Sequence, residues 1–251
     1  MDPASLVKRA LYVTGRAVRE TGQALDRLGC AIQGRLAYKE QLSRHRRLMP
    51  LYDKAPSIGA GTFVAPSAAV IGSVTIGRNS SVWYSAVIRG DVNAVKIGEN
   101  TSIGDRAVVH VTRNGLTGPK PLPTLIGDNV TVGQGALIHG CTIEDNAVVD
   151  IGATVMDGAV VSNNSILGTG ALLTEGQRIP SGEFWGGSPA KFIRKLTDVE
   201  IANIKATADR VQEISKKHDE FHSRSGEDQQ KERERVWNIA DRGEIPPEHL
   251  Y

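Results

Sequence analysis

A six-residue spacing of aliphatic residues is the feature that most restricts how this chain can fold. The spacing holds from residue 64 to 88, resumes after one nine-residue step, and returns after residue 124 with one five-residue step. Neither the 3.6-residue period of a helix nor the two-residue period of an ordinary strand describes it. The residues in this register are Val64, Val70, Ile76, Val82, Ile88, Ile97, Ile103, Val109, Ile126, Val132, Ile138, Ile143, Val149, Val155, Val161, Leu167, Leu173 and Ile179.

This period predicts an all-β solenoid. One flat strand per six residues fits a triangular coil in which each aliphatic side chain points inward and stacks on its counterpart one coil away. Small residues often follow the aliphatic ones, as in Ile76-Gly77, where a tight corner needs permissive dihedral angles. We predict a left-handed parallel β-helix of hexapeptide repeats over residues 55–190. Because such coils expose strand edges and apolar faces, we also expect a trimer.

The segment before the repeats, residues 1–50, is predicted to be a helical and basic extension. Leu11, Val18, Leu25 and Ile32 recur with a spacing of seven, as expected for one face of a helix. Three roles remain open for this helix: a targeting segment, a helix lying on a membrane surface, or a helix packed on a protein partner.

The repeats are interrupted once and are followed by two further segments. Residues 112–124 contain Asn-Gly, Gly-Pro and Pro-Leu-Pro sequences, so we expect a protruding loop. The sequence Thr-Asp-Val-Glu at 197–200 is a capping-box pattern, and it predicts a capping helix over residues 197–215. Residues 216–251 are densely charged, which favours a solvated or partner-bound tail.

Charge and cysteine content exclude several functional classes. With 30 basic and 28 acidic residues the net charge is +2, so we expect no nucleic-acid partner. The two cysteines, Cys30 and Cys141, are too few for a disulfide framework. No run approaches the roughly 20 apolar residues that span a bilayer, which predicts a soluble or peripheral protein.

Two histidines, His110 and His139, lie within the predicted coil and are 29 residues apart. Allowing for a loop of about 11 residues leaves about 18, the length of three hexapeptides, so they should stack on one edge. Imidazole is the commonest zinc ligand, although catalytic zinc needs three protein ligands and hydrogen-bonded surface histidines are the alternative. Gln134, five residues before His139, is a poor zinc ligand.

Arg89 and Asp91 place opposite charges on one side of a predicted corner. Two roles are open for this pair. It can hold subunits together, or it can take part in catalysis.

Several stretches of the chain together resemble the γ-class carbonic anhydrase family. They are residues 82–91 (VWYSAVIRGD), 109–111 (VHV), 138–142 (IHGCT) and 185–191 (WGGSPAK). Residues 19–30 (RETGQALDRLGC) and 40–46 (EQLSRHR) narrow the resemblance to the mitochondrial branch carried by respiratory complex I in plants and algae. The resemblance covers roughly residues 5 to 215.

The resemblance implies a trimer on the matrix side of the mitochondrial inner membrane, with homologous subunits and the membrane arm of complex I as partners. It also implies zinc between adjacent subunits, bound by two histidines of one chain and a third from its neighbour. His110 and His139 match ligand positions, Arg89 and Asp91 match the family's Arg/Asp pair, and Gln134 stands where the remaining histidine is expected.

Two more positions depart from the family pattern. Gly104 replaces a glutamine expected to hydrogen-bond the bound solvent, and Val92 replaces an acidic residue. The resemblance therefore implies that a homotrimer binds zinc weakly and hydrates carbon dioxide poorly, whereas a neighbour's histidine completes one site in a heterotrimer.

These departures leave the enzymatic status open. The leading prediction is an accessory, structural subunit of a complex I heterotrimer. The first alternative is a zinc-dependent carbonic anhydrase at a shared interface. The second is a hexapeptide acyltransferase, because the sequence GSPAK at 187–191 recurs in that class of enzymes.

Overall fold

The computed structural model describes residues 3–34, 45–113, 121–223 and 228. The chain forms two units, residues 1–44 and 45–251. The first unit contains one helix, α1 (Pro3–Gln33), as the heptad spacing predicts. Leu11, Val18, Leu25 and Ile32 are each more than 60 % exposed on it. None of the helices in the described ranges is long and apolar enough to cross a membrane.

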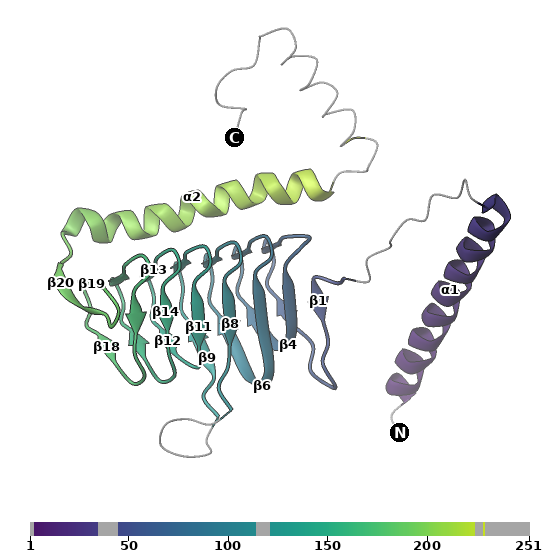
Figure 1. Ribbon diagram of the computed structural model, residues 1–251, viewed down its shortest axis with the longest axis horizontal. Helices are drawn as coiled ribbons and strands as arrows, with labels where there is room; N and C mark the ends of the chain where they lie inside the picture. Colours follow the sequence, from purple (N-terminus) through teal and green to yellow (C-terminus); the bar gives the residue numbers. More distant parts are fainter. Residues whose placement is uncertain (1–2, 35–44, 114–120, 224–227, 229–251) are drawn as a thin grey trace, which may run out of the picture. The chain divides into compact units, whose positions relative to one another are not determined.

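The second unit is a parallel β-solenoid with three faces and a helix lying along it (Figure 1). One face, called here the helix face, is an eight-stranded sheet. Its strands are β3 (Phe63–Val64), β5 (Ser81–Val82), β7 (Ser102–Ile103), β10 (Thr131–Val132), β13 (Val148–Val149), β16 (Ile166–Leu167), β19 (Glu183–Gly186) and β20 (Lys191–Lys195). All pair in parallel except β19 and β20, which are antiparallel.

The other two faces share a twelve-stranded sheet, because the long strands β4 (Ala69–Ile76) and β6 (Val87–Ile97) run across both of them. The face called here the histidine face continues through β1 (Leu48–Met49), β8 (Val108–His110), β11 (Leu137–His139), β14 (Thr154–Val155) and β17 (Leu172–Leu173). The third face continues through β2 (Ser57–Ile58), β9 (Thr124–Ile126), β12 (Thr142–Ile143), β15 (Val160–Val161) and β18 (Arg178–Ile179).

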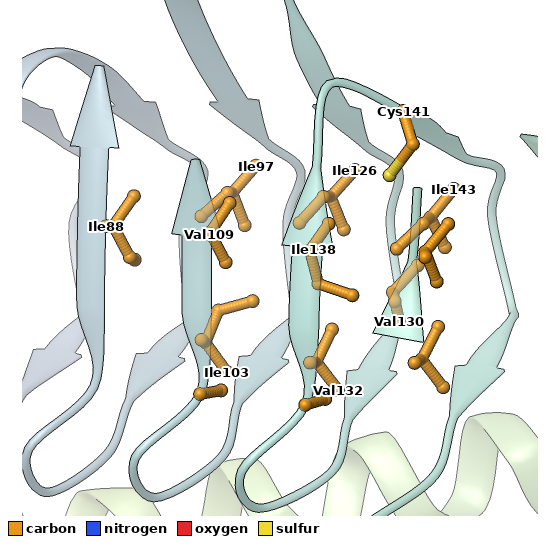
Figure 2. Close-up of a cluster of buried hydrophobic side chains, with 14 of the residues drawn as sticks. Ile88, Ile97, Ile103, Val109, Ile126, Val130, Val132, Ile138, Cys141 and Ile143 are labelled. Atoms are coloured by element: carbon orange, nitrogen blue, oxygen red, sulfur yellow. The ribbon is translucent and has the colours of Figure 1, made fainter. Parts of the chain in front are cut away.

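The aliphatic residues of the six-residue register form the core, as predicted. All eighteen are at most 7 % exposed, and twelve of them are fully buried at 0 %. Figure 2 shows how they stack: Ile88, Val109 and Ile138 lie on successive strands, paired in register, with their side chains inside the coil. Each such side chain contributes roughly 1.5–3 kcal/mol on burial, which makes the repeat the main source of stability.

One corner of the coil is built from asparagines in the left-handed backbone region. A short polar side chain tolerates this region better than other residues with a Cβ atom do, because it can hydrogen-bond locally. The stacked corner residues are Asn79, Asn100, Asn129, Asn146 and Asn164, with φ between 51° and 55°. Asn100 Nδ2 donates to Asn129 Oδ1 at 2.9 Å, so the stack is also linked through side chains.

The predicted capping helix is present as α2 (Asp198–Ser223), and it lies along the helix face (Figure 1). Its capping box forms: Glu200 N donates to Thr197 Oγ1 at 3.3 Å and Thr197 N donates to Glu200 Oε2 at 2.9 Å. The predicted end at residue 215 is wrong, because the helix continues to Ser223. The last turns pack on the coil through His218 and His222, which a search for aliphatic side chains does not detect.

The limits of the coil also differ from the prediction of 55–190. β1 pairs with β4 before the hexapeptide register begins, and β20 follows its end as an added antiparallel strand. Within the predicted loop 112–124, residues 114–120 lie outside the described residues, as do 35–44 of the extension and most of the predicted tail beyond Ser223.

Candidate metal centre

Arg89, His110 and His139 occupy the same position on three neighbouring strands of the histidine face. Arg89 pairs with His110 between β6 and β8, and His110 pairs with His139 between β8 and β11. Each follows an inward-pointing aliphatic residue, so its own side chain points outward, since successive side chains alternate along a strand. The predicted stacking of the two histidines on one edge is therefore what the structure has.

Carboxylates flank the two histidines and complete a row of side chains. His110 Nδ1 lies 3.2 Å from His139 Nε2, and His110 Nε2 lies 3.1 Å from Asp91 Oδ1. His139 Nδ1 contacts Asp157 Oδ1, from the turn after β14. Asp91, His110, His139 and Asp157 are called the histidine row below. Arg89 extends it, with Nε 3.2 Å from Asp91 Oδ2.

The protons of the row can be counted from these contacts. An ionised carboxylate only accepts hydrogen bonds, so the ring nitrogens facing Asp91 and Asp157 each carry a hydrogen. If both rings are neutral, His110 Nδ1 and His139 Nε2 then hold only lone pairs, and these face one another across 3.2 Å. Two lone pairs in contact repel, so the row needs a proton or a cation between its histidines.

The electrostatics favour a neutral His110 beside an ionised Asp91. Burial lowers the pKa of His110, and the charge of Arg89 lowers it further, while the hydrogen bond to Asp91 opposes this only in part. Burial acts to raise the pKa of Asp91, but the Val92 N–H, His110 and Arg89 outweigh it and leave that pKa below its ordinary value. Neutral imidazole is the form that binds metal ions.

The inner nitrogens fit two positions of a zinc site. Zinc bound tetrahedrally at about 2.0–2.1 Å places two imidazole nitrogens roughly 3.3 Å apart, and the observed separation is 3.2 Å. Each ring also directs its other nitrogen at a carboxylate, as metal-binding histidines commonly do. In the described part of the chain, no group of three or more His, Cys, Asp or Glu residues is placed to hold a metal ion.

Gln134 does not complete the pair within its own chain. It lies exposed on the turn between β10 and β11, whereas His139 ends β11. The strand β11 therefore lies between the two side chains and holds them at its two ends. Gln134 instead lines a cavity at the opposite corner of the histidine face, with Tyr84, Asp105 and Arg106.

The structure explains one of the departures from the family pattern. A Cβ on Gly104 would lie 2.8 Å from the backbone nitrogen of Gln134, so this turn has no room for a glutamine without a backbone shift. Val92, the other departure, is 39 % exposed beside Asp91 and carries no group that could accept a proton.

A second pair of histidines lies between α2 and the coil, and sequence reasoning missed it. His218 Nδ1 and His222 Nε2 each lie 2.8 Å from Tyr84 Oη, and the His222 ring stacks on Phe63. These four residues are called the tyrosine cluster below. Burial lowers the pKa of His218, as does the charge of His222, while burial raises the pKa of Tyr84. The available signal was the spacing of four residues between the histidines, which places them on one helix face.

Comparison with known proteins identifies the family. The chain is 54 % identical over 210 residues to gamma carbonic anhydrase 1, mitochondrial, of Arabidopsis thaliana, covering 84 % of this chain and 76 % of that protein. It is 52 % identical over 225 residues to gamma carbonic anhydrase 2, mitochondrial, of the same plant, covering 90 % and 81 %. The chain belongs to the gamma carbonic anhydrase family. The resemblance inferred from the sequence is thereby confirmed.

Further comparisons of this gamma carbonic anhydrase family chain extend the likeness beyond plants. Over 152 residues it is 51 % identical to a probable carbonic anhydrase of Methanocaldococcus jannaschii, covering 61 % of this chain and 91 % of the relative. A solved hexapeptide transferase family protein from Anaplasma phagocytophilum is 42 % identical with a TM-score of 0.62, covering 67 % of this chain and 95 % of that chain. No family model matches the sequence.

Proposed function

We propose that this chain is an accessory, structural subunit of a heterotrimer of gamma carbonic anhydrase family chains, held on the matrix side of the mitochondrial inner membrane at the membrane arm of complex I. One observation carries the proposal: within the described residues of its own chain the His110–His139 pair has no third ligand, because Gln134 lies at the opposite corner of the histidine face. The plant relatives, named as mitochondrial, support the compartment.

The outward side of the histidine face supports an assembly. Val87, Val108, Leu137, Thr154 and Leu172 are paired in register along five strands. Val108 is 36 % exposed and Leu137 is 38 % exposed, directly beside the histidine row. A neighbouring coil packed on this ladder would bury it and would bring a residue of its own to the row.

The helix α1 supports attachment to a partner. Its apolar residues are exposed along the helix, and four arginines and one lysine lie among the remaining positions. An amphipathic helix of this kind stabilises itself only by covering its apolar side with a protein groove or a membrane surface. We assign it to docking on a membrane-arm subunit, with contact to the membrane surface as the alternative.

The observed row also favours a second function, a carbonic anhydrase site shared between two subunits. His110 and His139 would hold zinc with a histidine of the neighbour, Asp157 and Asp91 would orient the two rings, and Arg89 would hold Asp91. Zinc bound by three histidines supplies Lewis-acid activation of water for hydration of carbon dioxide. Gly104 and Val92 provide neither a hydrogen bond to solvent nor a proton acceptor, so turnover at such a site should be slow.

The deciding experiment measures this chain and zinc together. Complex I is solubilised in mild detergent, the chain is quantified by mass spectrometry, and zinc is determined by elemental analysis in the complex and in the purified chain. Zinc in the complex alone supports a shared site, and zinc in neither supports a purely structural role. Absence of the chain from the complex contradicts the proposal.

Substitutions in the assembled complex test the ligands directly. His110→Asn should remove zinc from a shared site without releasing the chain. The matched control His218→Asn changes a histidine of the tyrosine cluster and should leave zinc unchanged. Zinc content that is unaffected by His110→Asn would exclude the shared site.

A further inference from the structure

We propose that Asp157 is a positioning residue of the histidine row, which accepts a hydrogen bond from His139 Nδ1–H and thereby keeps His139 Nε2 as the lone-pair nitrogen facing His110. Its consequence for metal binding rests on the proposed zinc site. The tautomer itself is a property of the metal-free chain and can be measured without zinc.

The lengths of two stacked turns bring Asp157 to His139. Ile138 pairs with Val155 before the turn, and Ile143 pairs with Val161 after it. The turn from Ile138 to Ile143 advances five residues, and the turn from Val155 to Val161 advances six. The turn from Val155 to Val161 therefore has one residue more. Asp157 lies in this turn, and its carboxylate contacts His139 Nδ1.

Gly140 leaves room for this contact. It has a φ of +52°, which suits glycine, and a Cβ placed on it would lie 2.7 Å from Asp157 Oδ1 and 3.0 Å from Thr112 Cγ2. A side chain at position 140 would thus collide with the carboxylate that reaches His139. Glycine here serves both the turn and the hydrogen bond.

Burial strengthens the preference of the Asp157 carboxylate for a hydrogen on His139 Nδ1. The Asp157 side chain is 15 % exposed and that of His139 is 31 % exposed, so solvent competes weakly for the carboxylate. A carboxylate deprived of water and in contact with a ring nitrogen favours the tautomer that donates to it. The two nitrogens that face carboxylates, His139 Nδ1 and His110 Nε2, then each carry a hydrogen.

The nearby Cys141 does not take this role. Its side chain is buried, and burial together with the charge of Asp157 raises the pKa of the thiol to about 12. It therefore stays protonated, and the thiolate form that binds metal ions is absent near neutral pH. The carboxylate of Asp157 is left as the group that fixes the His139 ring.

The tautomer is read by long-range ¹H–¹⁵N correlation on the metal-free chain labelled at histidine, at about pH 8, where ordinary histidines are neutral. Nδ1 of His139 should carry a hydrogen in the wild type, whether or not a further proton lies between the two rings, and in Asp157→Ala the hydrogen should shift toward Nε2. Asp157→Asn keeps an acceptor oxygen and should keep the Nδ1–H form. The matched control Asp145→Asn alters a corner aspartate that caps Asp128 N, and it should change nothing at His139.

A second measurement uses metal affinity in the Gln134→His background, which supplies the missing ligand. Loss of an outer partner of a ligand histidine costs about 10–100-fold in affinity, so Asp157→Ala should weaken zinc binding by that factor in chelator competition. If Asp157→Ala does not fold, Asp157→Leu of similar size replaces it.

The two measurements fail separately. If the Gln134→His chain binds no zinc, the proposed zinc site is wrong, while the tautomer still decides the role of Asp157. If the wild type and Asp157→Ala have the same His139 tautomer, the role of Asp157 is wrong whatever the zinc result.

Discussion

Two pairs of histidines in this protein meet their neighbours in different ways. In the histidine row the outer nitrogens face carboxylates, and the inner nitrogens of His110 and His139 face each other at 3.2 Å. In the tyrosine cluster His218 and His222 share one hydroxyl, that of Tyr84, at 2.8 Å each.

The difference lies in what each partner can do. A hydroxyl donates one hydrogen bond and accepts others, so Tyr84 can satisfy one ring as donor and the other as acceptor. Two carboxylates only accept, so they leave both inner lone pairs of the row unmatched. The tyrosine cluster is therefore complete as a packing contact between α2 and the coil, whereas the row is complete only with a proton or a cation added.

The largest expected effect comes from supplying a third ligand to the row. In the purified chain, Gln134→His should raise zinc affinity by more than about 100-fold, the upper limit of changes to outer partners of a ligand. Position 134 lies at the opposite corner of the histidine face from the pair of its own chain, so binding should require assembly and should disappear on dilution to monomer. Isothermal titration and analytical ultracentrifugation measure both. Gln134→Asn is the matched control, and equal zinc affinity in the two variants contradicts a row that lacks one ligand.

The next effect tests whether the row depends on its glycine. Gly140→Ala places a side chain in the left-handed region, which costs about 1–3 kcal/mol, and adds collisions with Asp157 and Thr112. Gly170→Ala has a similar φ of +63° with nothing within 4 Å, so it isolates the backbone strain. Denaturant unfolding should show the larger loss for Gly140→Ala. Equal losses would mean that the Asp157 contact adds nothing.

A smaller effect is expected from the tyrosine cluster. Tyr84→Phe removes the hydroxyl that both histidines contact, and leaving half-buried ring nitrogens without that partner should cost about 1 kcal/mol of unfolding free energy. The tautomer of His139 in the wild-type background should not change, since Tyr84 lies at the opposite corner of the histidine face. Tyr52→Phe is the control, since Tyr52 is 94 % exposed. A changed His139 tautomer in Tyr84→Phe would remove the distinction between the two pairs.

The smallest effect is a dependence on pH. Burial and the charge of His222 lower the pKa of His218 in the folded state, so the unfolded chain binds this proton more readily. The contribution of His218 is thus fully present above the ordinary pKa of about 6.5 and is lost as pH falls below it. Between about pH 7.5 and pH 5.5 the wild type should lose more unfolding free energy than His218→Asn. Parallel curves for the two proteins contradict this.

The sequence by itself determined the coil and the two histidine positions. Stacked burial repeats at every turn, so the six-residue register identifies eighteen of the buried residues that form the core. The distance of 29 residues between His110 and His139 placed them on one edge because the coil has a regular length. The likeness to gamma carbonic anhydrases then marked Arg89, Asp91 and Gln134.

Only the tertiary structure decided which side chains complete each pair. Asp157 reaches His139 because two stacked turns differ by one residue, and Tyr84 meets His218 across 134 residues of chain. The contacts of Tyr84 with His218 and His222 lie on the part of α2 beyond residue 215, where the helix continues to Ser223. Hydrophobic burial repeats along the chain and so leaves a period in the sequence. A hydrogen bond between two polar side chains depends on local turn lengths and on the positions of just those two residues. It occurs once and therefore leaves no periodic pattern in the sequence.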